Sequence, residues 1–350
     1  MAPTRPGSAL RILITGATGL LGAELMDRLG EQDGAELVAV SRRGAPNVAS
    51  WDMARDPPPA AITGRFDAII HTAADTRWTM GLTEAIEANV ATVQALAPLV
   101  ASDTHVIHVS TAYALGRGGD GSSSDPNAYR NSYEWSKAQA ERIALGLAER
   151  VSIVRPPLII GRRSDGRAAR FAGMYTILRG IASSVVPVVV AVPDAYFDVV
   201  PVDDVAEEVM AALHDRDSGV VHTIAGGKTA RPVAHCVEVI TGALNAWRRE
   251  RGLTAFDLPR LVSPDSWQRF YLPLAREHLS PRQEQILDLL SHFHPYLAVQ
   301  TPLEPTHVID CDDDCLAASV RYWADTHQRL AAQQPRSWQG LRQTTRPPAT

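Results

Sequence analysis

The stretch RILITGATGLLGAELM, residues 11–26, decides the fold. Its first five residues are mostly apolar or β-branched and predict a strand, and the apolar spacing after the glycines predicts a helix. Between the two stand Gly16, Gly19 and Gly22. Glycines there allow a tight turn, a close approach of the backbone to a pyrophosphate, and close packing of the helix on the strand. The stretch therefore predicts a dinucleotide site, with the phosphates at the N-terminus of the helix.

The end of the second predicted strand, residues 36–41, indicates which cofactor is used. A site for NAD usually carries an acidic residue here, which holds the ribose hydroxyls. This chain instead has Ser41, Arg42 and Arg43, and the planar guanidinium group of arginine suits a 2′-phosphate. We therefore expect NADPH, with NADH as the less favoured alternative, although arginines also occur in ordinary surface turns.

Asp52 and Met53 close the third predicted strand, at 51–53. The carboxylate of Asp52 can accept a hydrogen bond from the adenine amino group, or it can cap the turn without meeting the cofactor.

Strands and helices alternate through the first half of the chain. Short β-branched runs predict strands at 11–15, 36–41, 67–73, 105–110 and 151–155. Helical spacing predicts helices at 18–30, at 83–100 and around 132–141. Strands that alternate with helices of this length form right-handed crossovers and a parallel sheet covered on both faces. The predicted fold class is therefore α/β, with a doubly wound parallel sheet.

The pattern changes after Gly161. A helix is predicted near 169–182, then a strand and a helix capped near Asp203, and further helix starts at Pro232, Ser263 and Ser280. We therefore expect a smaller, mostly helical substrate-binding portion. The expected division is a flexible tail at 1–9, a cofactor domain at 10–160 with about 198–215, a substrate-binding portion at 161–197 and 216–332, and a flexible tail at 333–350.

The composition limits the classes of function. The 350 residues are 45% hydrophobic and 21% charged, with a formal charge of −5 and no clustering of Lys and Arg, so a small-molecule substrate is favoured over nucleic acid. Three cysteines and no glycosylation triplet favour a reducing, cytoplasmic setting. We expect no signal peptide, and the most apolar run, 185–193, is too short to span a membrane.

Two short motifs raise the question of a metal site. Cys311 and Cys315 flank three aspartates, but no second pair of ligands matches them, and acidic residues at a helix start more often form a cap. His292 and His294 are no better supported. No metal site is therefore predicted.

Tyr133 and Lys137 stand four residues apart within a predicted helix, so both side chains lie on one face. Such a pair is common by chance. Its context favours catalysis, because Ser110 and Thr111 end a strand at the carboxyl edge of the sheet, where open α/β folds bind ligands.

Seven motifs follow one another along the chain. They are TGATGLLG at 15–22, HTAAD at 71–75, Asn89, VSTAYALG at 109–116, Tyr133-x-x-x-Lys137, VRPPLIIG at 154–161 and VPVDDVA at 200–206. In this combination they resemble the extended short-chain dehydrogenase/reductase (SDR) family, over residues from about 10 to 230. The resemblance implies a Rossmann-type fold and an NAD(P)-dependent oxidoreductase.

The resemblance implies a role for each matching residue. Thr111 takes the place of the hydroxyl that binds the substrate oxygen, Tyr133 is the proton donor or acceptor, and Lys137 holds the nicotinamide ribose and lowers the pKa of the tyrosine. Such help is needed because a free phenol, with a pKa of ~10, is a poor acid-base catalyst near neutrality. Asn89 resembles the residue that braces the active-site helices. Ser110 is expected to be structural or to face the ribose.

The same resemblance, with the residues after the second and third strands, implies a set of cofactor-binding residues. They are Gly16, Thr18, Gly19, Leu20, Leu21, Gly22, Arg42, Arg43, Asp52, Met53, Ala73, Ala74, Tyr133, Lys137, Pro156, Pro157 and Leu158. The backbone of Pro156 to Leu158 is expected to meet the carboxamide of the nicotinamide.

Details within these motifs look most like the acyl-reductase branch of the family, which comprises fatty acyl reductases and the thioester reductase domains of peptide and polyketide assembly lines. They include the aromatic Trp78 and the segment GRRSDGR at 161–167. This branch implies that NADPH reduces a thioester, carried by CoA or by a carrier protein in trans, to an aldehyde; a second hydride would give the alcohol, and both end products stay open. Trp78, Thr111 and Ala112 are the expected substrate contacts, and the expected state is a monomer or homodimer.

Several alternatives stay open. A ketone or aldehyde reductase, or a nucleotide-sugar epimerase or dehydratase that recycles NAD, shares every catalytic residue, and a non-enzymatic dinucleotide sensor is a more distant alternative. The loop at 116–127 can act as a lid or be a mobile surface loop. The run at 185–193 can line an acyl pocket or lie in the core.

Overall fold

The computed structural model describes residues 10–31, 34–183, 188–273, 284, 287, 288 and 290–335. The chain divides into two compact units. Unit 1 comprises 1–159, 200–226 and 303–310, and unit 2 comprises 160–199, 227–302 and 311–350. The expected tail at 1–9, the expected C-terminal tail beyond residue 335 and the helix start at Ser280 lie outside the described residues.

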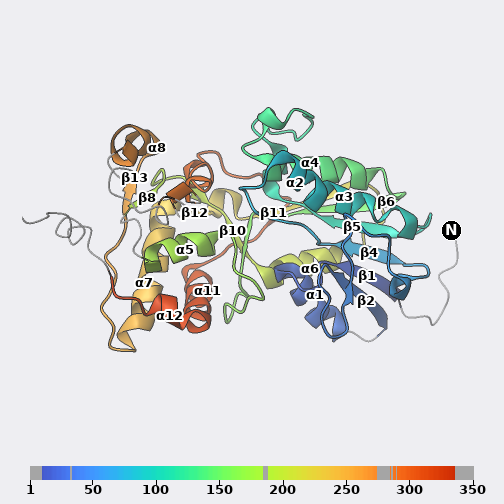
Figure 1. Ribbon diagram of the computed structural model, residues 1–350, viewed down its shortest axis with the longest axis horizontal. Coiled ribbons are helices and arrows are strands. Elements are labelled where there is room, and N and C mark those ends of the chain that lie inside the picture. The colour runs from blue at the N-terminus through green and yellow to red at the C-terminus, as the bar shows by residue number, and fades with distance from the viewer. Residues whose placement is uncertain are drawn as a thin grey trace, which may run out of the picture. The chain divides into compact units, whose positions relative to one another are not determined.

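Unit 1 is built on an eight-stranded parallel sheet with the order β14-β11-β6-β5-β4-β1-β2-β3 (Figure 1). Its strands are β1 (Leu10–Thr15), β2 (Ala35–Ser41), β3 (Ala49–Ser50), β4 (Ala68–His71), β5 (His105–Val109), β6 (Arg150–Arg155), β11 (Val220–Ala225) and β14 (His307–Val308). The strand order reverses between β1 and β4, and doubly wound sheets bind their ligands at such a point. The predicted α/β class with a doubly wound sheet is confirmed.

Helices cover both faces of this sheet (Figure 1). On one face, α1 (Leu20–Gly30) and α6 (Val202–Ala212) pack their leucines and valines against β1, β4 and β5. On the other face, α3 and α4 pack against β5 and β6. The helical segments on that face and in the connections are η1 (Ala60–Ile62), α2 (Leu82–Ala85), η2 (Ile86–Val90), α3 (Ala91–Gln94), η3 (Ala97–Leu99), η4 (Ala112–Leu115), η5 (Pro126–Ala128) and α4 (Ser132–Leu145).

The helix predicted at 83–100 is not a regular α-helix throughout. Between α2 and α3 the chain makes a π-helical turn, η2, and it ends in the 3₁₀ turn η3. A π-helical turn holds one extra residue, which the spacing of apolar residues does not reveal. The turn contains Asn89, whose side chain is 1% exposed.

Two segments expected in the substrate-binding portion belong to unit 1 instead. Strand β11 pairs with β6 along Val220–Thr223, and β14 pairs with β11. These strands extend the sheet because β6 would otherwise leave its backbone N–H and C=O groups unpaired along one edge. A two-residue strand such as β14 carries no sequence pattern of its own.

Unit 2 is mostly helical, as expected. Its elements are α5 (Met174–Ser183), β8 (Val188–Val190), β9 (Tyr196–Phe197), η6 (Gly227–Thr229), β12 (Arg231–Pro232), α7 (Val233–Arg249), β13 (Arg260–Val262), α8 (Pro264–Ser266), η7 (Trp267–Tyr271), η8 (Tyr296–Ala298), α11 (Asp313–Thr326) and α12 (Gln328–Ala331). Helices α7 and α11 lie side by side, and Trp247 Nε1 donates a hydrogen bond of 2.7 Å to Asp325 Oδ1. The short strands β7 (Leu158–Ile160) and β10 (Val199–Pro201) lie where the chain passes between the units.

The local signals for helix starts were right in two places. Ser263 caps α8, and its Oγ accepts a hydrogen bond from Ser266 N. Asp312 caps α11 by accepting a hydrogen bond of 2.9 Å from Cys315 N, and the other two aspartates between the cysteines lie in the first turn of this helix. Elsewhere the start differs by a residue or two, since α6 begins at Val202, before Asp203, and α7 begins after Pro232.

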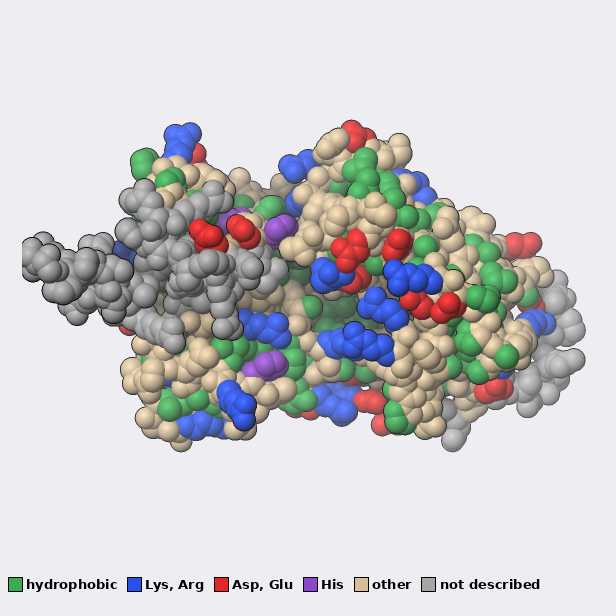
Figure 2. All heavy atoms as spheres, in the orientation of Figure 1, with side chains coloured by type: hydrophobic (Ala, Val, Ile, Leu, Met, Phe, Trp, Pro, Cys, Tyr) green, Lys and Arg blue, Asp and Glu red, His purple; other side chains and the backbone are tan. Residues whose placement is uncertain are grey.

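None of the described helices combines the length and the apolar character that crossing a bilayer requires. On the face that Figure 2 shows, basic and acidic side chains lie beside one another.

Candidate active site

Thr111, Tyr133 and Lys137 come together at the carboxyl end of β5. Thr111 follows this strand and caps η4, while Tyr133 and Lys137 lie on successive turns of α4. The Thr111 side chain is hydrogen-bonded to Tyr133, and Lys137 Nζ donates a hydrogen bond of 2.8 Å to Val109 O. The structure therefore brings the three residues together.

Burial sets the protonation of this cluster. Thr111, Tyr133 and Lys137 are 3%, 7% and 2% exposed. Burial raises the pKa of Tyr133 above its usual value, against the opposite effect of the hydrogen bond with Thr111. Burial also lowers the pKa of Lys137 to about 8, although the charge of Glu141 opposes this. Near pH 7, Tyr133 is therefore a neutral acid and Lys137 is still mostly a cation.

Asn89 connects the loop after β4 to the start of α4. Its Oδ1 accepts a hydrogen bond from Asp75 N at 2.8 Å, and its Nδ2 donates to Asp75 O and to Ser136 Oγ. Ser136 Oγ in turn donates to Tyr133 O at 2.8 Å. Asn89 thus holds the first turn of α4, which is the bracing position that the family resemblance implies.

Two buried histidines next to this cluster were missed by the sequence analysis. His71 and His108 are partners in the register of β4 and β5, and their rings stack with centroids 5.4 Å apart. His71 Nδ1 lies 2.8 Å from Thr15 Oγ1, whereas neither ring nitrogen of His108 has a hydrogen-bond partner among the described residues. Burial, and then the charge of Lys137, lowers both pKa values, that of His71 to about 3.

Both histidines are therefore neutral near pH 7, and Lys137 is the cation of this cluster. A signal for them was present in the sequence, because HTAAD and HVIHVS each place a histidine in a strand that borders the predicted site.

The glycine turn has the shape that a dinucleotide site requires. Gly16 has a φ of +71°, and a Cβ there would lie 2.7 Å from Ala73 N. A Cβ on Gly22 would lie 2.2 Å from Gly16 O. Gly19 precedes α1, and no side chain caps this helix, so its first N–H groups are left for a ligand.

The other residues predicted to bind the cofactor differ in whether their side chains are exposed, paired with another residue or packed into the core. Arg42 and Arg43 are exposed in the turn after β2. Asp52 faces Arg55, with 3.8 Å between carboxylate and guanidinium atoms, and its backbone oxygen accepts from Arg55 N and Asp56 N. The Met53 side chain packs into the core with Trp51, so only the backbone of Met53 is left to face a cofactor.

The segment Pro156–Leu158 is hydrogen-bonded to the residues that follow β5. Ala112 N and Thr111 Oγ1 both donate to Pro156 O, at 2.9 and 3.3 Å. Trp78 and Ala112, the other expected substrate contacts, are 9% and 2% exposed, so their side chains offer little surface to a ligand.

Comparisons with known proteins agree with this arrangement. Residues 59–209 match the family model described as male sterility protein. The terminal R domain from the myxalamid PKS-NRPS biosynthetic pathway is 20% identical, with 95% of this chain and 94% of that chain covered and a TM-score of 0.65. A thiolation-reductase di-domain from an archaeal non-ribosomal peptide synthetase is 16% identical, with 93% and 78% covered and a TM-score of 0.62. UDP-galactose 4-epimerase is 16% identical, with 91% and 99% covered and a TM-score of 0.56. No curated protein sequence matches the chain.

The chain has the extended SDR fold. The Rossmann-type fold that the seven motifs predicted is confirmed. At these low identities the solved structures establish the extended SDR fold alone, which reductases and an epimerase share.

In this extended SDR fold, the loop between Thr111 and Tyr133 is tied to α4. Trp135 Nε1 donates to Ser124 O at 2.9 Å, and Arg142 donates to Gly121 O and Ser123 O at 2.6 and 3.1 Å. Tyr129 also donates to Gly121 O and Ser123 O. Side chains of Tyr129, Trp135 and Arg142 therefore hold the carbonyl groups of this loop, for which the sequence left a lid and a mobile surface loop as alternatives.

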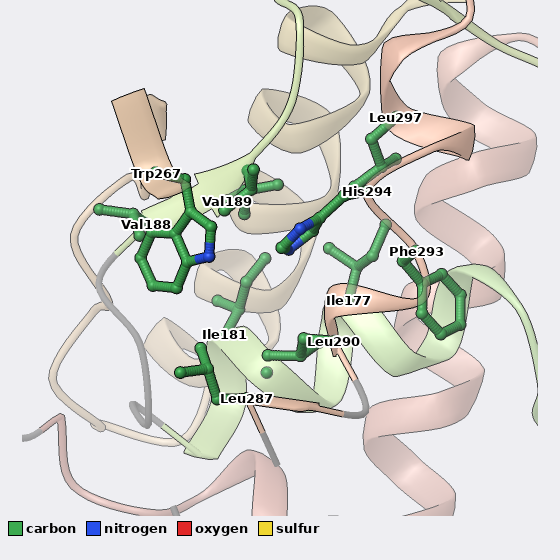
Figure 3. A pocket seen from close by; sticks show the side chains of 12 residues that line it. Ile177, Ile181, Val188, Val189, Trp267, Leu287, Leu290, Phe293, His294 and Leu297 are labelled. Atoms are coloured by element: carbon green, nitrogen blue, oxygen red, sulfur yellow. The ribbon is translucent and has the colours of Figure 1, made fainter. Parts of the chain in front are cut away.

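Unit 2 of the fold contains a cavity of about 40 Å³ (Figure 3). Apolar side chains from α5, β8 and η7 line it, among them Ile181 and Trp267. His294 is the one titratable residue among those that line it, and burial lowers its pKa to about 4, so it is neutral near pH 7. Val188 to Val190 belong to the lining, while residues 185–187 of the same apolar run lie outside the described residues.

Proposed function

We propose that this protein is an NADPH-dependent reductase of acyl thioesters, which releases an aldehyde and, in a second round, an alcohol. The hydrogen-bonded Thr111 and Tyr133, with the Lys137 cation close by, carry the proposal of carbonyl reduction. The match to the male sterility family model and the similarity to reductase domains of assembly lines support a thioester as the substrate. The apolar cavity of unit 2 has a lining that suits an acyl chain.

In the proposed reaction, Thr111 and Tyr133 bind the substrate oxygen, and Tyr133 with Lys137 transfers the proton. Bound NADPH supplies the hydride. The hydroxyl groups of Thr111 and Tyr133 donate hydrogen bonds to the substrate oxygen and stabilise the negative charge that develops on it. Tyr133 then gives up its proton, and the Lys137 cation stabilises the phenolate that remains. The resulting hemithioacetal splits into an aldehyde and a thiol.

The preference for NADPH rests on Arg42 and Arg43. They are exposed in the turn after β2, where a site for NAD usually has an acidic residue. The pyrophosphate fits the glycine turn, because a Cβ on Gly16 or Gly22 would collide with backbone atoms.

The partner is CoA or a carrier protein that acts in trans. The solved structure of a thiolation domain joined to a reductase domain supports the carrier. We further propose that the protein works in the cytoplasm as a monomer or homodimer.

Oxidation of NADPH by the purified protein, followed by absorbance over a panel of substrates, tests this function. We expect turnover with acyl-CoA or an acyl-phosphopantetheine carrier, and slower turnover with NADH. Tyr133→Phe should lower kcat by about 10²- to 10⁴-fold, as loss of a general acid does, with the Kd for NADPH unchanged. Tyr129→Phe, which also removes a buried tyrosine hydroxyl, is the matched control and should remain active.

Each negative outcome of these experiments would refute a different part of the proposal. Reduction of aldehydes or ketones alone would refute the thioester substrate. Conversion of sugar nucleotides with tightly bound NAD would favour an epimerase, the second candidate, because UDP-galactose 4-epimerase shares the fold. Undiminished turnover in Tyr133→Phe would remove the acid-base role.

A further inference from the structure

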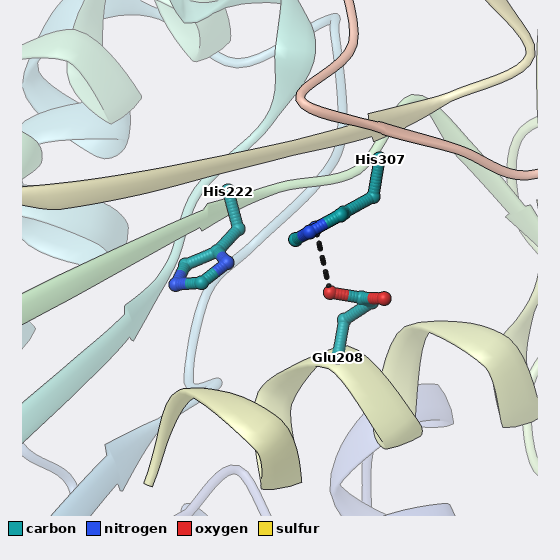
Figure 4. A group of neighbouring side chains, drawn as sticks. All are labelled: Glu208, His222 and His307. Carbon is teal, nitrogen blue, oxygen red and sulfur yellow. Dashed lines mark ion pairs between the residues drawn. The ribbon is translucent and has the colours of Figure 1, made fainter. Parts of the chain in front are cut away.

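Three side chains with metal-binding atoms meet near the edge of the unit 1 sheet. Glu208 lies on α6, His222 on β11 and His307 on β14, and one ligand atom of each lies within 4.8 Å of the other two (Figure 4). His307 Nδ1 lies 2.9 Å from Glu208 Oε2, and the rings of His222 and His307 stack with centroids 5.7 Å apart. The residues are far apart in the sequence, so only the fold assembles them.

Asp215 orients one of these ligands. Its Oδ2 lies 2.7 Å from His222 Nε2 and also accepts a hydrogen bond of 2.7 Å from Ser152 Oγ. At this distance the carboxylate accepts a hydrogen bond from the Nε2–H group of His222, and in that tautomer the lone pair lies on Nδ1. Figure 4 shows the nitrogen on that side of the ring turned toward Glu208 and His307.

We propose that Glu208, His222 and His307 bind a divalent transition-metal ion, for which Zn²⁺ is the best fit. Two imidazoles and one carboxylate form a known set of zinc ligands, and imidazole nitrogen favours zinc over Mg²⁺ or Ca²⁺. A carboxylate bound to the far nitrogen of a ligating histidine is a regular feature of such sites, because it fixes the tautomer and the orientation of the ring. Three protein ligands leave a fourth position for water.

The ligand atoms need only small movements to reach this geometry. In a tetrahedral site with bonds of about 2.1 Å, the ligand atoms lie about 3.4 Å apart. Glu208 and His307 already approach more closely than this, and the remaining pairs lie within 4.8 Å. The His307 side chain is 50% exposed and the His222 side chain 10% exposed, so His307 can move toward the fixed His222.

The bound ion would hold β14 in place at the edge of the sheet. This strand has two residues, His307 and Val308, and it is held to β11 by backbone hydrogen bonds from Thr306 N to Thr223 O and from Ile309 N to Ala225 O. A metal bond from His307 would attach the same strand to α6 as well. Short edge strands with few hydrogen bonds are the first to open, so the ion would stabilise this edge of the sheet.

Titration of the full-length protein with ZnCl₂ after removal of metal by EDTA tests this site. Calorimetry should find one tightly bound zinc per chain. At about one hundred times the Kd, zinc should raise the unfolding temperature by about 4 °C. His307→Ala and Glu208→Gln should each weaken binding at least tenfold and abolish the shift. Asp215→Asn should weaken it about 10- to 100-fold, as loss of an orienting carboxylate does.

His235→Ala is the matched control. His235 Nε2 lies 2.8 Å from Asp313 Oδ1 with similar exposure, but it belongs to no such group of three among the described residues. This variant should bind zinc like the wild type. Equal zinc affinity in the wild type and in His307→Ala, or no saturable binding by the wild type, would overturn the proposal. None of these measurements uses turnover, so the outcome is independent of the proposed reductase activity.

Discussion

Ser110 and Thr111 are neighbours in the chain whose hydroxyl groups have different surroundings. The Thr111 side chain is hydrogen-bonded to Tyr133 and donates to Pro156 O. Ser110 Oγ is buried and has no hydrogen-bond partner among the described residues. The proposed oxyanion contact therefore belongs to Thr111, in keeping with the role that the family resemblance implies for this residue.

Substitution of each hydroxyl by hydrogen tests this difference. Thr111→Ala should lower kcat/KM by about 100-fold or more, because one donor to the developing negative charge is lost. Ser110→Ala should change kcat/KM less than threefold and should not destabilise the fold, because it removes a buried group that has no partner. Steady-state kinetics on the best substrate of the panel decides, and a larger loss in Ser110→Ala than in Thr111→Ala would reverse the assignment.

Among the elements, the buried parallel strands were the easiest to predict. Strands β1, β2, β5 and β6 begin and end within a residue of the expected positions, because a strand covered on both faces is a continuous apolar run. The helix at 83–100 was predicted without its π-helical turn, and β14 was not predicted at all. Both make contacts with distant residues, Asn89 with Ser136 and β14 with β11, which local patterns do not contain.

The loop at 121–124 shows how one element fixes another. Trp135 on α4 donates to Ser124 O, so Trp135→Phe keeps most of the ring packing and removes one donor. We expect faster amide hydrogen exchange in residues 121–125 and an unfolding temperature within about 2 °C of the wild type, since one partly exposed hydrogen bond contributes about 1 kcal/mol.

Trp51→Phe is the matched control for this variant. Trp51 Nε1 donates to Asp56 O in another loop, so its loss should leave exchange at 121–125 unchanged. Equal exchange in Trp135→Phe and the wild type would show that the other donors hold the loop without Trp135.

For the molecule as a whole, most residues of the candidate site could be predicted from the order of the motifs along the sequence. The sequence brings Gly16, Thr111 and Tyr133 to one edge of the sheet because parallel strands end at that edge. The sequence places His71 and His108 in strands that border the site, but no local pattern predicts that they contact each other and Lys137. Their closeness to Lys137 follows from the pairing of β4 with β5 and the packing of α4.

These two histidines make the stability of unit 1 depend on pH. Burial, with the charge of Lys137, lowers their pKa values, that of His71 to about 3, whereas the pKa of a histidine in the unfolded chain is about 6.5. Below that pH the unfolded state binds more protons than the folded state, so the free energy of unfolding falls as the pH falls. Each histidine contributes at most about 1.4 kcal/mol per pH unit.

His108→Leu removes one of these groups and replaces an unpartnered polar ring with an apolar side chain. Between pH 7 and pH 5 its free energy of unfolding should fall by up to about 2 kcal/mol less than that of the wild type. Guanidinium unfolding at both pH values measures this, with the partly exposed His235→Ala as the control. Parallel losses in His108→Leu and the wild type would contradict the assignment of a neutral, buried His108.

The division into two units has a consequence for exchanging parts between relatives. The chain passes from one unit to the other after residues 159, 199, 226, 302 and 310. Neither unit is a continuous piece of sequence, so no single cut separates the cofactor sheet from the helical part. A hybrid that takes its substrate portion from another protein needs five splice points, and one that ends at residue 302 loses β14 and with it His307. New specificity is therefore more readily grafted by changing side chains within unit 2 than by joining whole segments.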